Sequence, residues 1–242
     1  MSKTIILIPS RYSARRLPGK PLLKIKNLPI ISHVVRKAKQ AKVGRVYVAT
    51  DSIKIMKEVQ RDKGKVIITK KKHKTGTDRI FEAFKKLNDT KISYIINLQG
   101  DEPGINFKDI RRLNKLMRKN KSQIGTIATQ IYDKKIFLKK SAVKVETYNK
   151  LNSNNFPLAK KFVRNVGYTK SKNYYHHMGI YAFRVDTFKK FVSLSRTTNE
   201  KKYSLEQLRA IDNKIPINVC KSKTFSFGID TIKDYIKMKK II

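Results

Sequence analysis

The sequence predicts an α/β fold with a mixed, mostly parallel β-sheet flanked by helices. Short, continuous apolar runs of strand length recur along the first half of the chain, and such runs are typical of strands buried on both faces of a sheet. Segments with apolar residues at helical spacing separate them, and this alternation favours parallel pairing. Ligands of parallel sheets bind beyond the carboxyl ends of the strands, so functional residues are expected there.

The first half contains four predicted strands and three predicted helices. The apolar, strand-length runs cover residues 4–8, 45–49, 66–69 and 94–98. Apolar residues at helical spacing cover residues 30–38, 53–59 and 80–87.

The second half is patterned less regularly. Strands are predicted over 124–130, 143–148 and 178–183, and helices over 186–194, over 204–212 and from about 231. Residues 151–173 are polar and rich in Asn and Lys, which predicts a long irregular segment. Because no linker rich in Gly, Pro and Ser occurs, we predict one domain over residues 1–242. Its first part ends at about 123, a second part covers about 124–225, and a C-terminal segment covers 226–242.

The chain is very basic, with 57 Lys and Arg against 17 Asp and Glu and a formal charge of +40 over 242 residues. Apolar residues make up 40%, which is enough for a buried core and excludes a wholly disordered chain. The lysines are spread along nearly every element, whereas a nucleic-acid-binding surface usually has clustered cations and a recognition motif. We therefore expect weak attraction to polyanions but no specific nucleic-acid partner.

Membrane insertion and disulfide bonding are not expected. No run approaches the ~20 apolar residues of a membrane helix, and the N-terminus lacks a signal-peptide pattern. Cys220 is the one cysteine, which excludes an internal disulfide and a zinc site built from cysteines. The sequence thus predicts a soluble, cytoplasmic protein without a membrane partner.

A cationic loop follows the first strand. It contains Arg11, Arg15, Arg16 and Lys20, with Gly19 beside Lys20. Arg binds phosphate oxygens in pairs, Lys offers a mobile point charge, and Gly allows the backbone to approach a ligand. The loop matches neither a Walker motif nor a dinucleotide fingerprint. It is interpreted as a polyphosphate-binding loop, the alternative being a solvated loop of a basic protein.

Two acids stand out because acids are scarce. Asp101, next to Glu102, follows the fourth strand, and Asp230 precedes the C-terminal helix. Magnesium typically takes one or two carboxylates and completes its shell with phosphate oxygens and water. Taken separately, Asp101 can be a turn residue and Asp230 a helix N-cap. Together with the cationic loop, they favour a two-carboxylate metal site.

Two further motifs have open interpretations. In the segment 72–79, Thr77 or Asp78 can cap the following helix, or the loop can bind a base and ribose. The pair His176 and His177 lies far in sequence from the other histidines, which argues for buried histidines instead of a metal site. No signature of Ser-His-Asp catalysis is found.

Seven motifs occur in one order along the chain. They are R-Y-x-x-x-R-L-P-G-K-P-L, A-T-D, H-x-T-G-T-D-R, L-Q-G-D-E-P, H-x-G-I-Y-A-F-R, S-L-E-Q-L-R and G-I-D-T. From about residue 5 to 235 the chain closely resembles the 3-deoxy-manno-octulosonate cytidylyltransferase family, the CMP-Kdo synthetases. H-x-G-I-Y followed by L-E-Q-L-R distinguishes this branch from other sugar-nucleotide cytidylyltransferases.

The resemblance implies a Rossmann-like nucleotide-diphospho-sugar transferase fold with a smaller, less regular lobe for dimerisation and sugar binding. It also implies Mg²⁺ dependence, a homodimer, and transfer of CMP from CTP to 3-deoxy-D-manno-octulosonate (Kdo) with release of pyrophosphate, for lipopolysaccharide biosynthesis. Lys20, Arg16 and Asp101 would be catalytic, with Lys20 stabilising charge at the α-phosphorus. Asp101 and Asp230 would bind Mg²⁺.

The remaining implied site residues bind substrates. Those for the nucleotide are Pro9, Ser10, Arg11, Arg16, Lys20, Asp51, Thr75, Gly76 and Gln99. Those for the sugar acid are His177, Tyr181, Glu206 and Gln207.

The chain departs from the family mainly in its sugar-binding half. Ser153 stands where the family has an Arg that contacts the sugar carboxylate, so Lys160 or Lys161 could replace it, or a related acid such as 8-amino-Kdo or a sialic-type sugar could be the acceptor. Tyr203 stands where an acid is usual, and Gly104 where an apolar residue is usual. A third alternative is a non-catalytic polyanion-binding protein.

Overall fold

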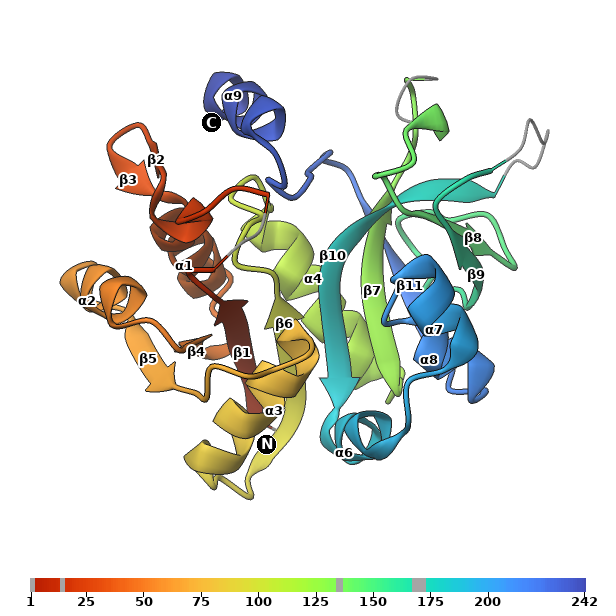
Figure 1. Cartoon of the computed structure of the whole chain (residues 1–242). Coiled ribbons are helices and arrows are strands. Elements are labelled where there is room, and N and C mark those ends of the chain that lie inside the picture. The colour runs from red at the N-terminus through yellow and green to blue at the C-terminus, as the bar shows by residue number, and fades with distance from the viewer. Residues whose placement is uncertain (1–2, 14–15, 134–136, 167–172) are drawn as a thin grey trace. The chain divides into compact units, whose positions relative to one another are not determined.

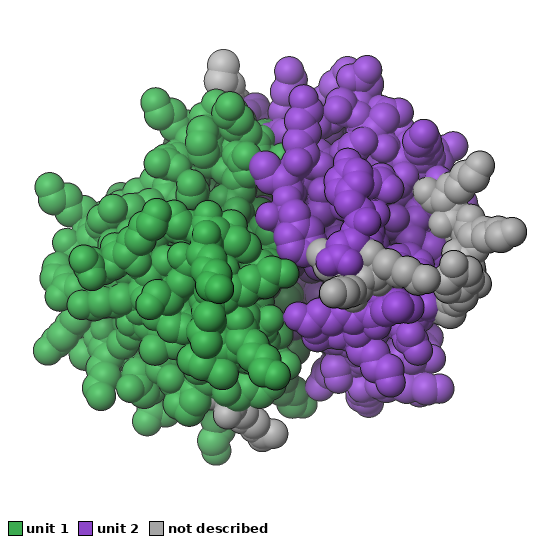
Figure 2. Space-filling model, turned by 90° about the horizontal axis from the view of Figure 1, so that it is seen from above, with its two compact units in different colours: residues 1–111, 226–242 green, residues 112–225 purple. Residues whose placement is uncertain are grey.

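The computed structural model describes residues 3–13, 16–133, 137–166 and 173–242 (Figure 1). The chain forms two compact units, coloured separately in Figure 2. Unit 1 comprises residues 1–111 and 226–242, and unit 2 comprises residues 112–225. Helix α4 (Phe107–Lys119) contains the boundary between them. Within the described ranges, no helix combines the length and apolar composition needed to cross a bilayer.

Unit 1 contains a parallel sheet, as predicted. Its strands, in spatial order, are β6 (Ile92–Leu98), β1 (Lys3–Ser10), β4 (Gly44–Thr50) and β5 (Lys65–Ile68). The helices between successive strands are α1 (Ile30–Gln40), α2 (Ile53–Arg61) and α3 (Gly76–Leu87).

The apolar runs in β1 and β6 are buried, as expected. The run in β5, at the edge of the sheet, is not: Val66 and Ile67 are half-buried and Ile68 is 40% exposed. In β1, the side chains from Ile5 to Ile8 are fully buried, and each contributes about 1.5–3 kcal/mol on leaving water. The chain passes from β1 outward to β4 and β5 and then returns to β6 on the other side of β1. Because such crossovers are right-handed, this reversal places α3 on the face opposite α1 and α2. The carboxyl ends of β1 and β6 therefore form a topological switch point, where ligands bind.

The C-terminal segment completes unit 1. Helix α9 (Ile232–Ile241) and the short elements η1 (Lys20–Leu22), β2 (Lys24–Ile25) and β3 (Leu28–Pro29) surround a small apolar cluster that includes Ile25, Ile229 and Met238. A Cβ on Gly104 would lie 3.3 Å from the Met238 sulfur and 3.2 Å from the Ser226 hydroxyl. Met238 thus occupies the space that a larger residue at position 104 would need.

Unit 2 contains a mixed sheet. Strand β7 (Ile124–Thr129) runs parallel to β11 (Ile217–Ser222) and antiparallel to β10 (Tyr174–Arg184). Strand β8 (Lys144–Thr147) pairs antiparallel with both β10 and β9 (Ala159–Val163). The helices that follow β10 are α6 (Val185–Ser193), α7 (Thr198–Tyr203) and α8 (Leu208–Asp212).

Two predictions for unit 2 were wrong. Strand β9 lies inside the segment that was predicted to be irregular. It was missed because its two adjacent lysines, Lys160 and Lys161, break the alternation of buried and exposed residues. The predicted helix over 204–212 begins only at Leu208, since Ser204 has a left-handed conformation (φ 51°) and ends α7.

Several elements were not predicted at all, among them α7 and the short η1, β2 and β3. Strand β11 was missed, and so was α4, although Ile110, Leu113 and Met117 are fully buried and follow helical spacing. That spacing was a usable signal in the sequence.

A buried ion pair ties α7 to α8. Both guanidinium contacts of Arg209 to the Glu200 carboxylate are 2.7 Å long, and neither side chain is more than 3% exposed. Burial raises the pKa of Glu200, but hydrogen bonds and charge from Arg209 and Arg196 outweigh it and lower the pKa below its ordinary value. Its stabilising effect is therefore complete above the unfolded pKa of ~4.3 and is lost as the pH falls through the lower folded pKa.

Replacing Glu200 by Gln is expected to reduce the free energy of unfolding by about 3–5 kcal/mol, because Arg209 would remain buried without its counter-charge. Urea unfolding at pH 7 measures this change. Asp186→Asn is the matched control, since Asp186 is 64% exposed and its pair with Arg184 lies at the surface of the same unit. Equal stabilities of the two variants would contradict the assigned role of the pair.

Candidate functional site

Lys20 lies between Asp101 and Asp230, the two acids predicted to form a metal site. Its Nζ is 2.6 Å from Asp101 Oδ2 and 3.7 Å from Asp230 Oδ1. Arg16 Nη2 is 3.0 Å from Asp230 Oδ1. All four residues belong to unit 1. The structure thus brings together two of the four cations of the predicted phosphate loop and the two carboxylates of the predicted metal site.

The conformation of the cationic loop fixes Lys20. Gly19 has a left-handed φ of 67°, a conformation that favours glycine, and its N–H donates to the Tyr12 carbonyl oxygen at 3.2 Å. This turn places Lys20 at the first position of η1, with its side chain only 13% exposed. Arg16 is 65% exposed and Arg11 is also exposed, so both can move towards a ligand. Arg15 lies outside the described residues.

Backbone contacts hold Asp230 beside Asp101. The Ile229 N–H donates to the Asp101 carbonyl oxygen at 2.9 Å. Thr231, and not Asp230, is the N-cap of α9, where it forms a capping box with Asp234. The N-cap interpretation of Asp230 is therefore wrong, and its carboxylate faces the cations.

The donor set is compatible with Mg²⁺. Two carboxylates from different loops approach one ammonium group, whose position between them is favourable for a positive charge. In the described part of the chain, no group of three or more His, Cys, Asp or Glu residues is placed to hold a metal. The pair Asp101 and Asp230 suits a hard cation that takes its remaining ligands from phosphate and water.

A second group of predicted residues meets at the ends of β1 and β6. A Cβ built on Gly76 would lie 3.2 Å from Pro9 Cγ and 3.8 Å from Gln99 Oε1, so these three residues are neighbours. The Gln99 amide donates to Asn97 Oδ1 at 3.3 Å, which orients it. Ser10 is buried, and its hydroxyl finds no hydrogen-bond partner among the residues described. A buried, unpaired hydroxyl at a switch point is a natural contact for a ligand.

Asp51 and Thr75 have partners within unit 1. Asp51 Oδ1 is 3.5 Å from Nη1 of the buried Arg79. Thr75 is the N-cap of α3, and its Oγ1 accepts from the Asp78 N–H at 3.1 Å. The expectation that Thr77 or Asp78 is the cap is therefore wrong, although Asp78 supplies the returning half of the capping box.

The predicted sugar-binding residues lie in unit 2. His177 and Tyr181 are on β10, with ring centroids 5.3 Å apart. Thr126 Oγ1 donates to the Ile180 carbonyl oxygen, so it must accept from His177 Nε2, at 2.9 Å. Burial and the neighbouring His176 lower the pKa of His177 to about 3. His177 is therefore neutral and carries its hydrogen on Nε2, so it offers a sugar acid no positive charge.

The other predicted sugar-binding residues adjoin α8. Gln207 is the N-cap residue of α8 and is buried, and Glu206 precedes it. The buried Arg209 of the same helix, which pairs with Glu200, anchors this segment.

The proposed substitutes for the missing arginine are already paired. Lys160 and Lys161 lie 3.5 and 3.1 Å from the Glu146 carboxylate, and each is about half exposed. Arg112, which was not predicted to have a role, donates to the Ser153 carbonyl oxygen and to the Lys221 carbonyl oxygen. Its place on α4, about 40 residues earlier, gave no signal in the sequence.

Comparison with known proteins gives matches over nearly the whole chain. A family model described as Cytidylyltransferase matches residues 5–218. A 3-deoxy-manno-octulosonate cytidylyltransferase from Thermodesulfovibrio yellowstonii is 43% identical over 96% of this chain and 94% of its own length. A protein of the same name from Rhodopseudomonas palustris is 37% identical, covering 100% of this chain and 98% of its own.

Solved structures of nucleotide-binding enzymes have the same fold. A CMP:2-keto-3-deoxy-manno-octonic acid synthetase complexed with CTP superposes with a TM-score of 0.88 at 35% identity, covering 99% of this chain and 98% of its own. A UTP-bound UGPase from Acinetobacter baumannii shares the fold, with a TM-score of 0.70 at 12% identity over 100% of this chain and 93% of its own.

Proposed function

Because the chain belongs to the 3-deoxy-manno-octulosonate cytidylyltransferase family, we propose that it transfers CMP from CTP to Kdo and releases pyrophosphate. The observation that carries this proposal is the position of Lys20 between Asp101 and Asp230. A relative of known structure that is 35% identical was solved in complex with CTP. The proposal includes Mg²⁺ as cofactor, a homodimer, and a cytoplasmic step of lipopolysaccharide biosynthesis.

In the proposed reaction, the 2-hydroxyl of Kdo attacks the α-phosphorus of CTP in line, and pyrophosphate leaves. Negative charge accumulates on the phosphoryl oxygens, so fixed positive charge supplies most of the catalysis. Lys20 is the best fixed cation of the loop, since Gly19 and η1 hold it and its side chain is largely buried. Arg16 and Arg11, which are exposed, would close on the outer phosphates. Mg²⁺ held by Asp101 and Asp230 would neutralise phosphate charge.

The nucleoside would contact the neighbours at the carboxyl ends of β1 and β6. Pro9, Gly76 and Gln99 are close enough there to form a wall, and the unpaired Ser10 hydroxyl is available for a hydrogen bond. A side chain at position 76 would meet Pro9, so Gly76 keeps this space open.

The acceptor would be held by residues of unit 2. His177 is neutral, so it can orient the sugar acid by hydrogen bonding but cannot balance its carboxylate. The cation for that carboxylate is absent from position 153, which is a serine. Lys160 and Lys161, which are half-exposed and pair with Glu146, are the candidates that remain for this contact.

Release of pyrophosphate from CTP and Mg²⁺ tests the function when it is measured with Kdo, 8-amino-Kdo and N-acetylneuraminate in parallel. We expect turnover with Kdo and much slower turnover with the other two acids. Lys20→Ala protein is the control for contaminating activity. If pyrophosphate is released with only one of the other acids, that acid and not Kdo is the acceptor. If no pyrophosphate is released with any of the three, the enzymatic function is refuted.

A further inference from the structure

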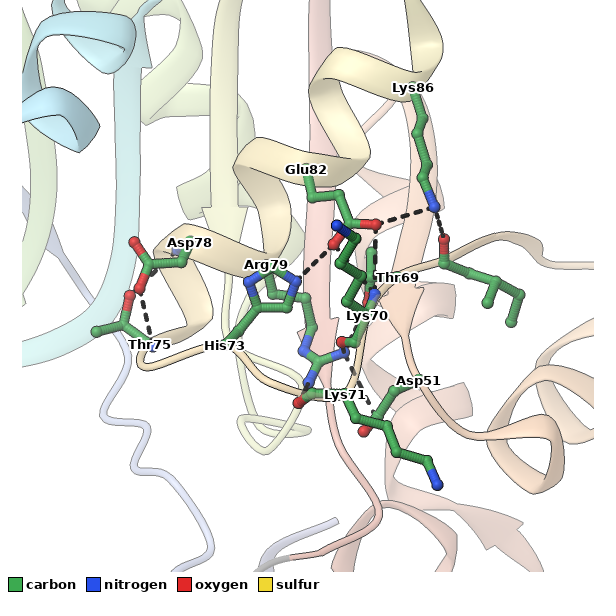
Figure 3. A network of polar contacts seen from close by, with 11 residues as sticks. Asp51, Thr69, Lys70, Lys71, His73, Thr75, Asp78, Arg79, Glu82 and Lys86 are labelled. Atoms are coloured by element: carbon green, nitrogen blue, oxygen red, sulfur yellow. Dashed lines mark hydrogen bonds and ion pairs between the residues drawn. The ribbon is translucent and has the colours of Figure 1, made fainter.

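Two side chains of α3, Arg79 and Glu82, reach back to the segment that precedes the helix (Figure 3). This segment, residues 69–75, connects β5 to α3 and has no helix or strand of its own. The Thr69 N–H donates to the Thr50 carbonyl oxygen at 2.8 Å, and beyond this residue the segment leaves the sheet. Its conformation then depends on side-chain contacts.

Glu82 gathers three donors. Its carboxylate accepts from the Lys70 N–H at 3.0 Å and from His73 Nε2 at 2.6 Å, and it pairs with Lys86 Nζ at 2.9 Å (Figure 3). Because a carboxylate only accepts, His73 carries a hydrogen on Nε2. Burial raises the pKa of Glu82, but hydrogen bonds from Lys86, Lys70 and His73 outweigh it and lower the pKa to about 2. Glu82 is therefore ionised throughout the neutral range.

Arg79 holds the beginning of the same segment. It is buried, and its Nη1 donates to the Thr69 hydroxyl at 2.6 Å and to the Lys70 carbonyl oxygen at 3.3 Å. Its Nη2 donates to the Lys71 carbonyl oxygen at 3.4 Å. The carboxylate of Asp51, at the end of β4, lies 3.5 Å from the same guanidinium. One helix thus fixes both ends of the stretch 69–73.

The segment ends at Thr75 and Gly76. The capping box joins the backbone of Thr75 to the first turn of α3, and Gly76 lies against Pro9 at the carboxyl end of β1. A change in the path of residues 70–74 would therefore move the residues that approach Pro9 and Gln99.

We propose that Glu82 and Arg79 are positioning residues of the nucleotide site: they hold residues 69–74 so that Thr75 and Gly76 meet CTP in one arrangement. Neither residue has a described contact with Lys20, Asp101 or Asp230. Their effect is therefore expected on the binding of CTP and not on the chemical step. This inference rests on the proposed function, in which Thr75 and Gly76 line the CTP site.

Glu82→Gln tests the proposal, because it keeps the size of the side chain and removes the charge that three donors share. We expect the KM for CTP to rise about tenfold, the effect of one lost charge-assisted hydrogen bond. The value of kcat at saturating CTP should change less than about twofold, and so should the KM for Kdo. Glu58→Gln is the matched control, because Glu58 lies on α2 and pairs only with its helix neighbour Arg61 among the contacts described. It should behave as wild type.

Substitutions of His73 separate positioning from loss of stability. His73→Leu removes the donor to Glu82 and should raise the KM for CTP, whereas His73→Gln supplies an amide donor and should restore it in part. Thermal unfolding of each variant monitors the fold. An unchanged KM for CTP in both Glu82→Gln and His73→Leu, or a fall in kcat with an unchanged KM, overturns the proposal.

Calorimetric titration with CTP and no acceptor keeps this test apart from the proposed function. A tenfold higher dissociation constant for CTP in Glu82→Gln, with the wild-type value in Glu58→Gln, supports the positioning role. This result does not depend on which acid is the acceptor. Equal dissociation constants in all three proteins overturn it. Failure of the wild-type protein to release pyrophosphate with Kdo would instead refute the acceptor.

Discussion

Replacing Lys20 by Ala is expected to reduce turnover of CTP with Kdo by at least ~100-fold, the scale of one preorganised electrostatic group. Lys20 is the cation that the loop holds most firmly, since Gly19 sets the turn and the side chain is 13% exposed. Its positive charge would stabilise the negative charge that develops on the phosphoryl oxygens in the transition state. Steady-state release of pyrophosphate measures the change, and Lys24→Ala, an exposed lysine of the adjacent strand β2, is the control.

The same variant should gain affinity for a divalent cation while it loses activity. In the wild type, the Lys20 ammonium neutralises Asp101 at 2.6 Å and Asp230 at 3.7 Å. Without it, the two carboxylates repel each other and attract a metal more strongly. Titration with Mn²⁺ in the absence of CTP, followed by electron paramagnetic resonance, reports this affinity. Activity near that of wild type, or weaker Mn²⁺ binding, would remove Lys20 from its assigned role.

Asp101→Asn is the second variant with a large expected effect, again at least ~100-fold in turnover. The amide keeps the shape of the side chain but lacks the charge that holds Lys20 and would bind Mg²⁺. More Mg²⁺ should be needed for half-maximal activity, because the metal would lose a charged ligand.

Turnover measured across a range of Mg²⁺ concentrations checks this expectation. Asp62→Asn is the control, since Asp62 forms its ion pair with Arg36 at the surface between α2 and β5. If Asp101→Asn keeps wild-type turnover at low Mg²⁺, Asp101 is not part of the metal site.

The parallel sheet of unit 1 was predictable mainly because β1 and β6 are buried on both faces. Runs such as Ile5–Ile8 and Tyr94–Ile96 are continuous and apolar, whereas a helix on an exposed surface has apolar residues on one face only. The scarcity of acids had a similar value for the site. In a chain with 17 carboxylates, Asp101 and Asp230 could be selected, and the structure places both beside Lys20.

What the sequence did not reveal depends on contacts between distant residues. The single turn at Ser204 separates α7 from α8, and no local pattern indicates its left-handed conformation. The roles of Arg79 and Glu82 depend on a segment that lies up to 12 residues earlier and has no periodicity. The pairing of Lys160 and Lys161 with Glu146 requires the antiparallel register of β8 and β9, which their sequences do not fix.

The route of the chain has a consequence for biosynthesis. Unit 1 is discontinuous: residues 226–242 return to it only after all of unit 2, and Asp230 reaches Asp101 through the Ile229 N–H. During translation the first 111 residues can collapse early, since domains fold as they emerge from the ribosome. The second carboxylate, however, is synthesised only after the whole of unit 2. A nascent chain that ends before residue 230 therefore carries the Lys20 loop but lacks the paired acids.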